Sequence, residues 1–222
     1  AEQRCERGHA IIALGGGMVG DLAGFVAATF LRGVPVVQVP TSLAAMVDAS
    51  IGGKTAVNLA AGKNLMGAFY QPRMVLADLS TLKTLPPREL ASGWAEAIKH
   101  GLILDASLFH LFEEKSEELM KLEAEVTAEV VRLSMEIKAR IVEEDEKETL
   151  GRRMLLNYGH TIGHGLEAAT EYTTLLHGEA VSVGMGAAAR ISHKMGLLSQ
   201  GEVERQSALL RRFGLPTACA AA

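Results

Sequence analysis

Three histidines and one glutamate in the C-terminal part of the chain have the side-chain types of a catalytic metal site. His160 and His164 are four residues apart, which puts both imidazoles on one side of a helix. Threonine follows His160, so the glutamate base of a His-Glu-x-x-His zinc protease is absent. Together with His177 and Glu96, these residues could bind a metal ion through two imidazoles and one carboxylate. Such a ligand set leaves one coordination position of the metal open, as in catalytic zinc sites. The spacing does not choose between His160, His164 and His100 as ligands.

A cation and an amide accompany these histidines along the chain. We expect a helix over 153–170, where side chains turn by about 100° per residue. One narrow stripe of that helix would carry Arg153, Asn157, His160 and His164. A solvated helix face usually carries Glu, Lys and Gln, so this stripe indicates a site instead of plain surface.

Lys138 indicates an anion near the same region. We expect a long helix over 117–145, and Lys138 interrupts its apolar stripe. Burying an ammonium costs free energy unless an anion meets it. A lysine stem at the edge of the core, with the ammonium in water, is the alternative. Together with Arg153, Lys138 predicts a pocket for a substrate anion.

A glycine-rich turn near the N-terminus predicts a dinucleotide site. Residues 15–21, Gly-Gly-Gly-Met-Val-Gly-Asp, follow an expected strand and open an expected helix, as the Gly-x-Gly-x-x-Gly pattern requires. The backbone of such a turn can approach a pyrophosphate, which the helix N-terminus attracts. No acidic residue follows about 20 residues later, near Pro40, which disfavours an ordinary Rossmann dehydrogenase. A tight turn without a ligand is the alternative.

The polar, glycine-containing segment 41–64 is expected to be a loop. Gly52-Gly53-Lys54-Thr55 resembles the end of a Walker A loop, but Asp48 stands where that motif needs its first glycine. The segment follows the C-terminal end of a strand, where open α/β sheets bind ligands, although a plain surface loop is the alternative. Its candidate ligand-binding residues are Asp48, Lys54, Lys63 and Asn64.

The composition changes from α/β to helical near Pro86-Pro87. Glycine and β-branched residues are frequent before this point, and Glu, Leu, Ala and Lys after it. We predict an α/β domain over 1–86, with an incomplete Rossmann-like parallel sheet, and an all-α domain over 87–222. The expected strands are 10–14, 34–39 and 74–77, with a helix over 19–30. The expected later helices are 88–102, 105–113, 117–145, 153–170, 178–195 and 201–213.

The overall composition is that of a globular protein. The 222 residues include 22 Lys and Arg, 26 Asp and Glu, and 48% hydrophobic residues, which excludes disordered, collagen-like and strongly basic nucleic-acid-binding classes. Cys5 and Cys219 make no disulfide framework, and no apolar run approaches the roughly 20 residues of a membrane span. We expect a cytoplasmic protein without nucleic-acid or membrane partners. Three strands make a thin parallel sheet, so we expect the sequence to begin inside a longer protein.

Eight motifs, in order along the chain, resemble the 3-dehydroquinate synthases of the sugar-phosphate cyclase family. They are GGGMVGD at 15–21, PTS at 40–42, MVDASIGGK at 46–54, GKN at 62–64, FYQP at 69–72, WAEAIKH at 94–100, NYGHTIGH at 157–164 and HGE at 177–179. The resemblance implies an NAD-binding α/β domain followed by a helical domain, with the active site between them and a homodimeric assembly. Family members are longer, so it also implies further segments at both ends.

The resemblance also assigns roles to individual residues. The divalent metal, Zn²⁺ or Co²⁺, would be bound by Glu96, His160 and His177. The expected NAD-binding residues are Gly16, Gly17, Asp21, Thr41, Ser42, Asp48, Lys54, Lys63, Thr84 and Leu85. The substrate phosphate would be held by Lys54, Asn64, Lys99 and His164, with Arg32 reaching over from the partner subunit. The substrate carboxylate would meet Lys138 and Arg153, and its hydroxyls Asp48 and Asn157.

The reaction that the resemblance implies converts 3-deoxy-D-arabino-heptulosonate 7-phosphate into 3-dehydroquinate and phosphate. It is a carbon–oxygen lyase reaction of the shikimate pathway, which leads to chorismate and the aromatic amino acids. NAD-dependent oxidation, β-elimination of phosphate, reduction and intramolecular aldol closure follow one another. The alternatives are another sugar-phosphate cyclase such as 2-deoxy-scyllo-inosose synthase, a metal- and NAD-dependent polyol dehydrogenase, and a folded remnant without turnover. Lys138 and Arg153 favour a substrate with a carboxylate.

Overall fold

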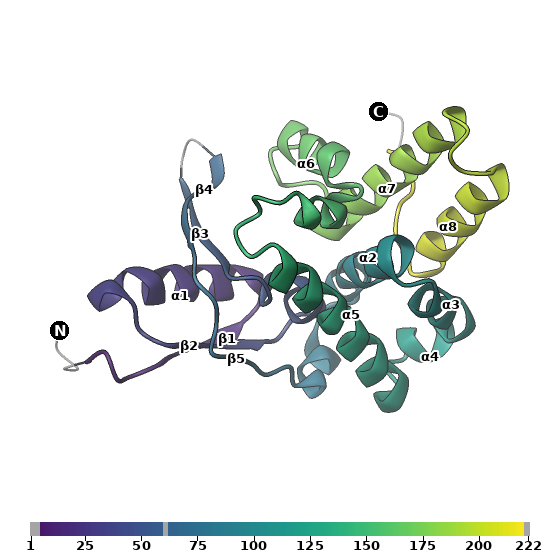
Figure 1. Cartoon of the computed structure of the whole chain (residues 1–222). Helices are drawn as coiled ribbons and strands as arrows, with labels where there is room; N and C mark the ends of the chain where they lie inside the picture. The colour runs from purple at the N-terminus through teal and green to yellow at the C-terminus, as the bar shows by residue number, and fades with distance from the viewer. Residues whose placement is uncertain (1–4, 60–61, 220–222) are drawn as a thin grey trace.

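The first part of the chain is a small parallel sheet with one helix packed on it. The computed structural model describes residues 5–59 and 62–219. Strands β1 (Ile11–Gly15), β2 (Val36–Pro40) and β5 (Met74–Val75) are parallel, in the order β1-β2-β5. Helix α1 (Gly17–Thr29) runs from β1 back towards β2 (Figure 1). The predicted βαβ unit and the α/β class of this part are confirmed, with β5 shorter than expected.

The two faces of this sheet differ in exposure. Ala13 of β1 is buried and packs with Ala27 of α1 and with Val36 of β2. Ile12 and Leu14 alternate with Ala13 and are 67% and 64% exposed. The sheet is therefore covered by α1 on one face and exposes apolar side chains on the other.

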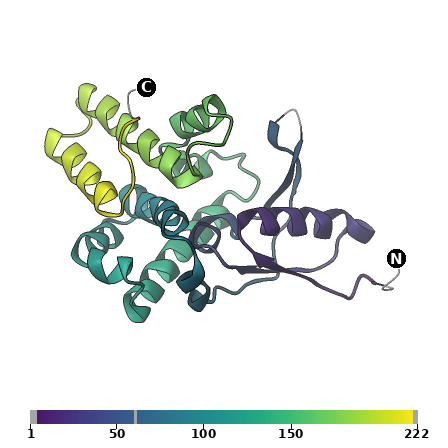
Figure 2. The ribbon, with the colours of Figure 1, turned by 180° about the vertical axis from the view of Figure 1, so that it is seen from behind.

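An antiparallel hairpin follows, where the sequence analysis predicted a loop. Strands β3 (Lys54–Leu59) and β4 (Gly62–Phe69) pair with each other and project between α1 and the helical part of the molecule (Figures 1 and 2). The expectation of a loop over 41–64 was wrong for β3 and the start of β4. These strands lack a clear apolar alternation. Helix α1 packs closely on β3, since a Cβ on Gly24 would come within 2.4 Å of Thr55 Cγ2.

The second part of the chain is helical throughout, as expected. Its helices are α2 (Pro87–Leu104), α3 (Ala106–Glu114), α4 (Ser116–Met120), α5 (Ala124–Glu144), α6 (His160–Ala169), α7 (His177–Lys194) and α8 (Gln200–Arg212). The short helical turns of the chain are η1 (Phe30–Arg32), η2 (Ala45–Ala49), η3 (Leu79–Thr84) and η4 (Arg152–Asn157). No helix among residues 5–59 and 62–219 combines the length and the apolar character needed to cross a membrane.

Two of the expected helices are interrupted. The helix predicted over 117–145 is divided into α4 and α5, with Leu122 between them in the left-handed region at φ +55°. The helix predicted over 153–170 is divided into the 3-10 segment η4 and helix α6. Gly159 separates them at φ +80°, and a Cβ there would lie 2.6 Å from Val181 O, so tight packing on α7 decides the break. The single stripe expected for Arg153, Asn157, His160 and His164 therefore does not exist.

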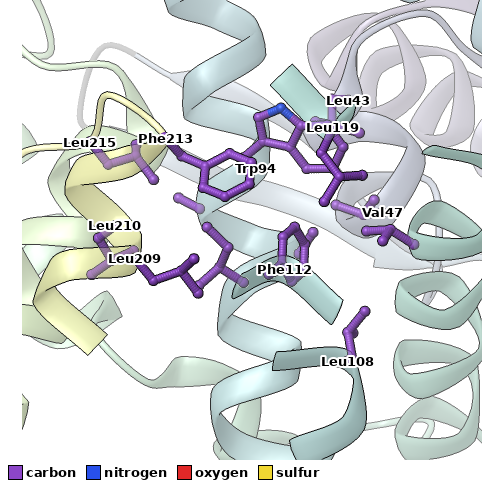
Figure 3. Packing of buried hydrophobic residues seen from close by; sticks show 14 of the residues in the cluster. Leu43, Val47, Trp94, Leu108, Phe112, Leu119, Leu209, Leu210, Phe213 and Leu215 are labelled. Atoms are coloured by element: carbon purple, nitrogen blue, oxygen red, sulfur yellow. The ribbon is translucent and has the colours of Figure 1, made fainter. Parts of the chain in front are cut away.

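The main core joins the two parts of the chain. Trp94 of α2, Phe112 of α3 and Phe213 after α8 make edge-to-face contacts, with ring centroids 5.6 to 5.8 Å apart (Figure 3). Leu43 and Val47, from the segment after β2, belong to the same buried cluster. The loop that follows the sheet is thus anchored in the helical core, which holds it against α2 and α5.

Candidate active site

Three side chains from three helices converge on one point. Glu96 of α2 is buried, and its Oε1 lies 3.6 Å from Nε2 of His160 on α6 and 3.5 Å from Nε2 of His177 on α7. All three ligand atoms lie within 4.8 Å of one another. The structure thus brings together the residues to which the resemblance assigns the metal.

Glycines allow these helices to approach closely. A Cβ on Gly178 would lie 1.9 Å from the carbonyl oxygen of Ser92, and a Cβ on Gly184 would lie 1.9 Å from that of Gly159. Gly178 N also donates a hydrogen bond of 2.9 Å to Ser92 Oγ. The backbone of α7 therefore touches that of α2 next to His177, which brings this histidine to Glu96.

The geometry of the three donors fits a zinc-type ion. Ligand atoms about 2.1 Å from a tetrahedral ion lie about 3.4 Å from one another. The measured separations from Glu96 Oε1 are close to that value, at 3.5 and 3.6 Å. Among the described residues this buried oxygen has no hydrogen-bond partner, whereas Oε2 of the same carboxylate accepts a hydrogen bond from Lys99 Nζ. Glu96, His160 and His177 would hold the ion.

The pKa values show that this position favours positive charge. Burial opposes ionisation of Glu96, yet Lys99, His177 and His160 hold the pKa of its carboxyl well below the usual value. Burial also disfavours a charged His177, but the nearby carboxylates of Glu167 and Glu96 raise its pKa to about 10. A divalent cation supplies positive charge at the same point when its ligands release their protons.

The remaining histidine candidates lie nearby but differ in environment. The ring of His164 is 5.3 Å from that of His160, and His164 is exposed towards the cavity described below. His100 is fully buried behind Glu96 and Asp48, and burial lowers its pKa to about 4. Neither ring belongs to the group of three that surrounds Glu96 Oε1, although His164 lies near His177 and Glu167.

Two buried cations, Lys138 and Arg153, line the same cavity as His160 and His177. Lys138 Nζ is 2.6 Å from Asp48 Oδ1 and donates to the Asp48 carbonyl, so the anion expected for this lysine is a residue of the chain itself. Burial opposes the charge of Asp48, but Lys138 brings the pKa of Asp48 down to about 2. Arg153 is buried too, and its Nη1 donates to the carbonyls of Gly52 and Glu146.

These side chains line one cavity of about 550 Å³ between the hairpin and the helices. The residues assigned to substrate, cofactor or metal that line it are Asp21, Asp48, Lys54, Asn64, Lys99, Lys138, Arg153, Asn157, His160, His164 and His177. The hairpin forms one wall, with Thr55 on β3 and Phe69 on β4. Predicted site residues from both parts of the chain therefore share one open cavity.

Two lysines tie the hairpin to the helical part. Lys54 Nζ is 2.7 Å from Glu148 Oε2, in the segment after α5. Lys63 Nζ lies 3.6 Å from Glu167 Oε1 and 3.7 Å from the centroid of the Tyr172 ring. The structure therefore places the ammonium of Lys63 beside Glu167 of α6 and Tyr172.

The glycine turn has the form expected for a dinucleotide site. Gly16 precedes α1 without a side-chain cap, and a Cβ there would lie 3.4 Å from Ser42 Oγ at the end of β2. Thr41 N donates to Gly15 O, so the ends of β1 and β2 lie together. A Cβ on Gly17 would lie 3.3 Å from that of Ala49, which lines the cavity. Bare backbone and an uncapped helix N-terminus thus face the position where a pyrophosphate would bind.

Three predicted residues lie elsewhere. Arg32 is exposed in η1, at the opposite end of α1 from the glycine turn. Thr84 ends η3, and Leu85 follows it; neither lines the cavity. The resemblance places Arg32 in a partner's site, so its position in one chain does not bear on that role.

Two acidic residues of the site were missed by the sequence analysis. Glu148 lines the cavity and pairs with Lys54. Glu167 is buried beside His177 and follows His164 by three residues on α6. That i,i+3 spacing of histidine and acid was the available signal for Glu167.

Comparison with known families agrees with this arrangement. Residues 1–92 match the family model described as 3-dehydroquinate synthase N-terminal, and residues 93–222 match 3-dehydroquinate synthase C-terminal. The chain belongs to the 3-dehydroquinate synthase family. The curated 3-dehydroquinate synthase of Pelobacter propionicus is 56% identical over 211 residues, which are 95% of this chain and 58% of that protein. The chain thus spans a little under three fifths of the length of this curated relative.

Solved structures of other sugar-phosphate cyclases share the fold. ValA, the 2-epi-5-epi-valiolone synthase of Streptomyces hygroscopicus subsp. jinggangensis 5008 with NAD⁺ and Zn²⁺ bound, is 33% identical with a TM-score of 0.92, over 98% of this chain and 61% of that one. A 2-deoxy-scyllo-inosose synthase complexed with carbaglucose-6-phosphate, NAD⁺ and Co²⁺ is 36% identical with a TM-score of 0.84, and the match covers 96% of this chain and 59% of that one. Relatives of this 3-dehydroquinate synthase family chain therefore bind NAD⁺ and a divalent metal.

Proposed function

We propose that this chain carries the metal-binding centre and much of the substrate site of a 3-dehydroquinate synthase, a lyase that acts on a sugar phosphate. The observation that carries the proposal is the convergence of Glu96, His160 and His177 on one point in a cavity that also contains Lys138 and Arg153. Curated relatives that are 56% and 53% identical carry the name 3-dehydroquinate synthase. The proposed substrate is 3-deoxy-D-arabino-heptulosonate 7-phosphate.

The chain's own residues would bind and orient the substrate. When bound, NAD⁺ accepts a hydride transiently and the divalent metal polarises a substrate oxygen. Lys54 and His164 would hold the phosphate, since Lys54 lines the cavity from β3 and His164 lines it from α6. Lys138 and Arg153 are buried cations, and in low dielectric their attraction for a carboxylate is strong. Asp48 and Asn157 would accept and donate hydrogen bonds at the hydroxyls.

A carboxylate on the substrate distinguishes the proposed reaction from those of other sugar-phosphate cyclases. A sugar phosphate without a carboxylate, or an uncharged polyol, would offer no carboxylate to Lys138, which pairs with Asp48, or to Arg153, which donates to backbone carbonyls. We therefore place the enzyme in the shikimate pathway. The proposed assembly is a homodimer, in which Arg32 acts in the partner's site.

Phosphate release tests this function directly. Incubation with 3-deoxy-D-arabino-heptulosonate 7-phosphate, NAD⁺ and Zn²⁺ or Co²⁺ should release phosphate and yield 3-dehydroquinate with no net NADH. Omitting NAD⁺ or adding a chelator should abolish the release. Turnover without NAD⁺ would contradict the proposal, and accumulation of NADH with a polyol would support a dehydrogenase instead. In the same assay His160→Ala should lose metal-dependent turnover, and a normal rate with stoichiometric metal would remove His160 from the ligand set.

A further inference from the structure

Glu167 is a buried acid that none of the assigned roles explains. It lies on α6, two helical turns after His160, and its side chain is 8% exposed. Its Oε2 is 3.3 Å from Nδ1 of His177, and its Oε1 is 3.6 Å from Nζ of Lys63. A buried carboxylate in contact with an imidazole calls for a specific interaction, because burying the charge alone is unfavourable.

The two imidazoles beside Glu96 are oriented in the same way. Each directs Nε2 towards Glu96 Oε1, at 3.6 Å for His160 and 3.5 Å for His177. Each has a hydrogen-bond acceptor at the other nitrogen: the Tyr158 carbonyl oxygen lies 3.3 Å from Nδ1 of His160, and Glu167 lies 3.3 Å from Nδ1 of His177. A neutral imidazole that offers Nε2 to a metal must carry its proton on Nδ1 and donate it.

The two histidines differ in how firmly packing holds them. The side chain of His160 is 13% exposed, whereas that of His177 is 41% exposed. Packing therefore restrains the His160 ring, but it leaves much of the His177 ring in contact with solvent. A hydrogen bond at Nδ1 is the remaining means of orienting His177, and Glu167 is the residue that supplies the acceptor.

We infer that Glu167 is a positioning residue for the metal site: it accepts the Nδ1 proton of His177 and thereby holds this ring with Nε2 towards Glu96. The inference rests on the metal site of the proposed function and adds a residue outside the three ligands. Acceptors of this kind fix the tautomer and increase the basicity of a ligating imidazole.

Metal binding to the intact protein tests this role. The metal-free protein is titrated with Co²⁺, whose visible absorption reports the geometry of its ligands, and the Kd is measured by chelator competition. Glu167→Gln should weaken Co²⁺ binding by about 10- to 100-fold and change the absorption spectrum. An amide either accepts the proton less strongly or, when turned over, donates to Nδ1 and holds the wrong tautomer.

Matched variants separate positioning from a general loss of fold. Glu171→Gln makes the same change at an exposed position four residues later, and it should leave the Kd and the spectrum unchanged. Glu167→Asp keeps the charge on a shorter side chain and should weaken binding by less than Glu167→Gln. If Glu167→Gln fails to fold, the Glu167→Asp comparison decides the question, and wild-type affinity in it would overturn the inference.

A different result would assign Glu167 another role. His164, Glu167 and His177 also lie within 4.8 Å of one another. If the wild type binds two Co²⁺ ions per chain and Glu167→Gln loses one of them, Glu167 is a ligand and the positioning role is wrong. An unchanged Kd in Glu167→Gln overturns this inference alone, whereas absence of Co²⁺ binding in the wild type overturns the proposed function as well.

Discussion

Individual buried charges in this site depend on their partners. Lys138 is 8% exposed at its side chain, whereas that of its partner Asp48 is 27% exposed. If Asp48 is neutralised, the Lys138 ammonium stays in the core without its anion. If Lys138 is replaced, Asp48 can still reach water. The two members of this ion pair should therefore contribute unequally to stability.

This asymmetry predicts different free energies of unfolding for the two single variants. Asp48→Asn should lower the free energy of unfolding by about 3 kcal/mol, and Lys138→Met by about 1 kcal/mol. The double variant should recover most of the loss, because no buried charge is left unpaired. Urea denaturation at pH 7 measures the free energy of unfolding of the wild type, the two single variants and the double variant. Equal losses in the two single variants would contradict the burial argument.

The burial of His100 predicts that the stability of the fold depends on pH. Its ring is fully buried near Asp48, Glu96, Lys99 and Lys138, and burial lowers its pKa from 6.5 to about 4. Between pH 6.5 and 4, His100 therefore binds a proton in the unfolded chain but stays neutral in the folded chain. Stability is full above pH 6.5 and should decrease by about 3 kcal/mol as the pH falls to about 4.

The comparison variant for this prediction is His100→Leu, which has no titrating group. Its free energy of unfolding should fall less than that of the wild type between pH 6.5 and 4, when both proteins are free of metal. Parallel curves would show that His100 does not titrate as proposed.

At the scale of the elements, close helix contacts decide whether the proposed metal ligands meet. The backbone of α7 at Gly178 touches the carbonyl of Ser92 on α2, immediately beside the proposed ligand His177. Side chains at that position would separate the two helices, because the obstructing atoms belong to the backbone and cannot rotate away.

We therefore predict that Gly178→Ala reduces both stability and Co²⁺ affinity. The overpacking should cost about 1–3 kcal/mol in the free energy of unfolding, and the shifted His177 should weaken metal binding. Gly165→Ala on α6 is the matched control, because an added Cβ there meets nothing within 4 Å and should stabilise its helix by about 0.5–1 kcal/mol. Wild-type Co²⁺ affinity in Gly178→Ala would show that the contact does not position the ligand.

At the scale of the whole molecule, the sheet exposes an apolar face. Ile12 pairs in register with Val37, which pairs with Met74, so these side chains form a row on the face away from α1. Ile12, Leu14 and Met74 are 67%, 64% and 54% exposed. Parallel sheets usually have both faces covered, so this face is unusual for the class.

The 222-residue chain should therefore bind a hydrophobic fluorescent dye and self-associate with increasing concentration. Ile12→Thr/Leu14→Thr should reduce dye fluorescence and self-association with little change in the free energy of unfolding, since both side chains are exposed in the folded state. Fluorescence titration and analytical ultracentrifugation measure these effects. Undiminished dye binding in the double variant would assign it to another surface.

The sequence by itself determined the local elements and the types of chemistry. Alternating and periodic apolar residues, the glycine turn at 15–21 and the composition change near Pro86-Pro87 predicted the βαβ unit and the helical second part, because these signals act within a few residues. Metal-ligand residue types were visible as well. Residue spacing alone left His160, His164 and His100 as equal candidates, and only the family motifs separated them.

Only the tertiary structure decided which residues meet. The hairpin β3–β4, the break at Gly159, the pairing of Lys138 with Asp48 and the contact of Glu167 with His177 all join segments through packing. Lys138 and Asp48 are 90 residues apart in the chain, and no local pattern specifies such a pair. The contacts among the helices form because α2, α5 and α7 share one close-packed core and α6 packs on α7 at Gly163. Close packing sets positions that periodicity leaves open.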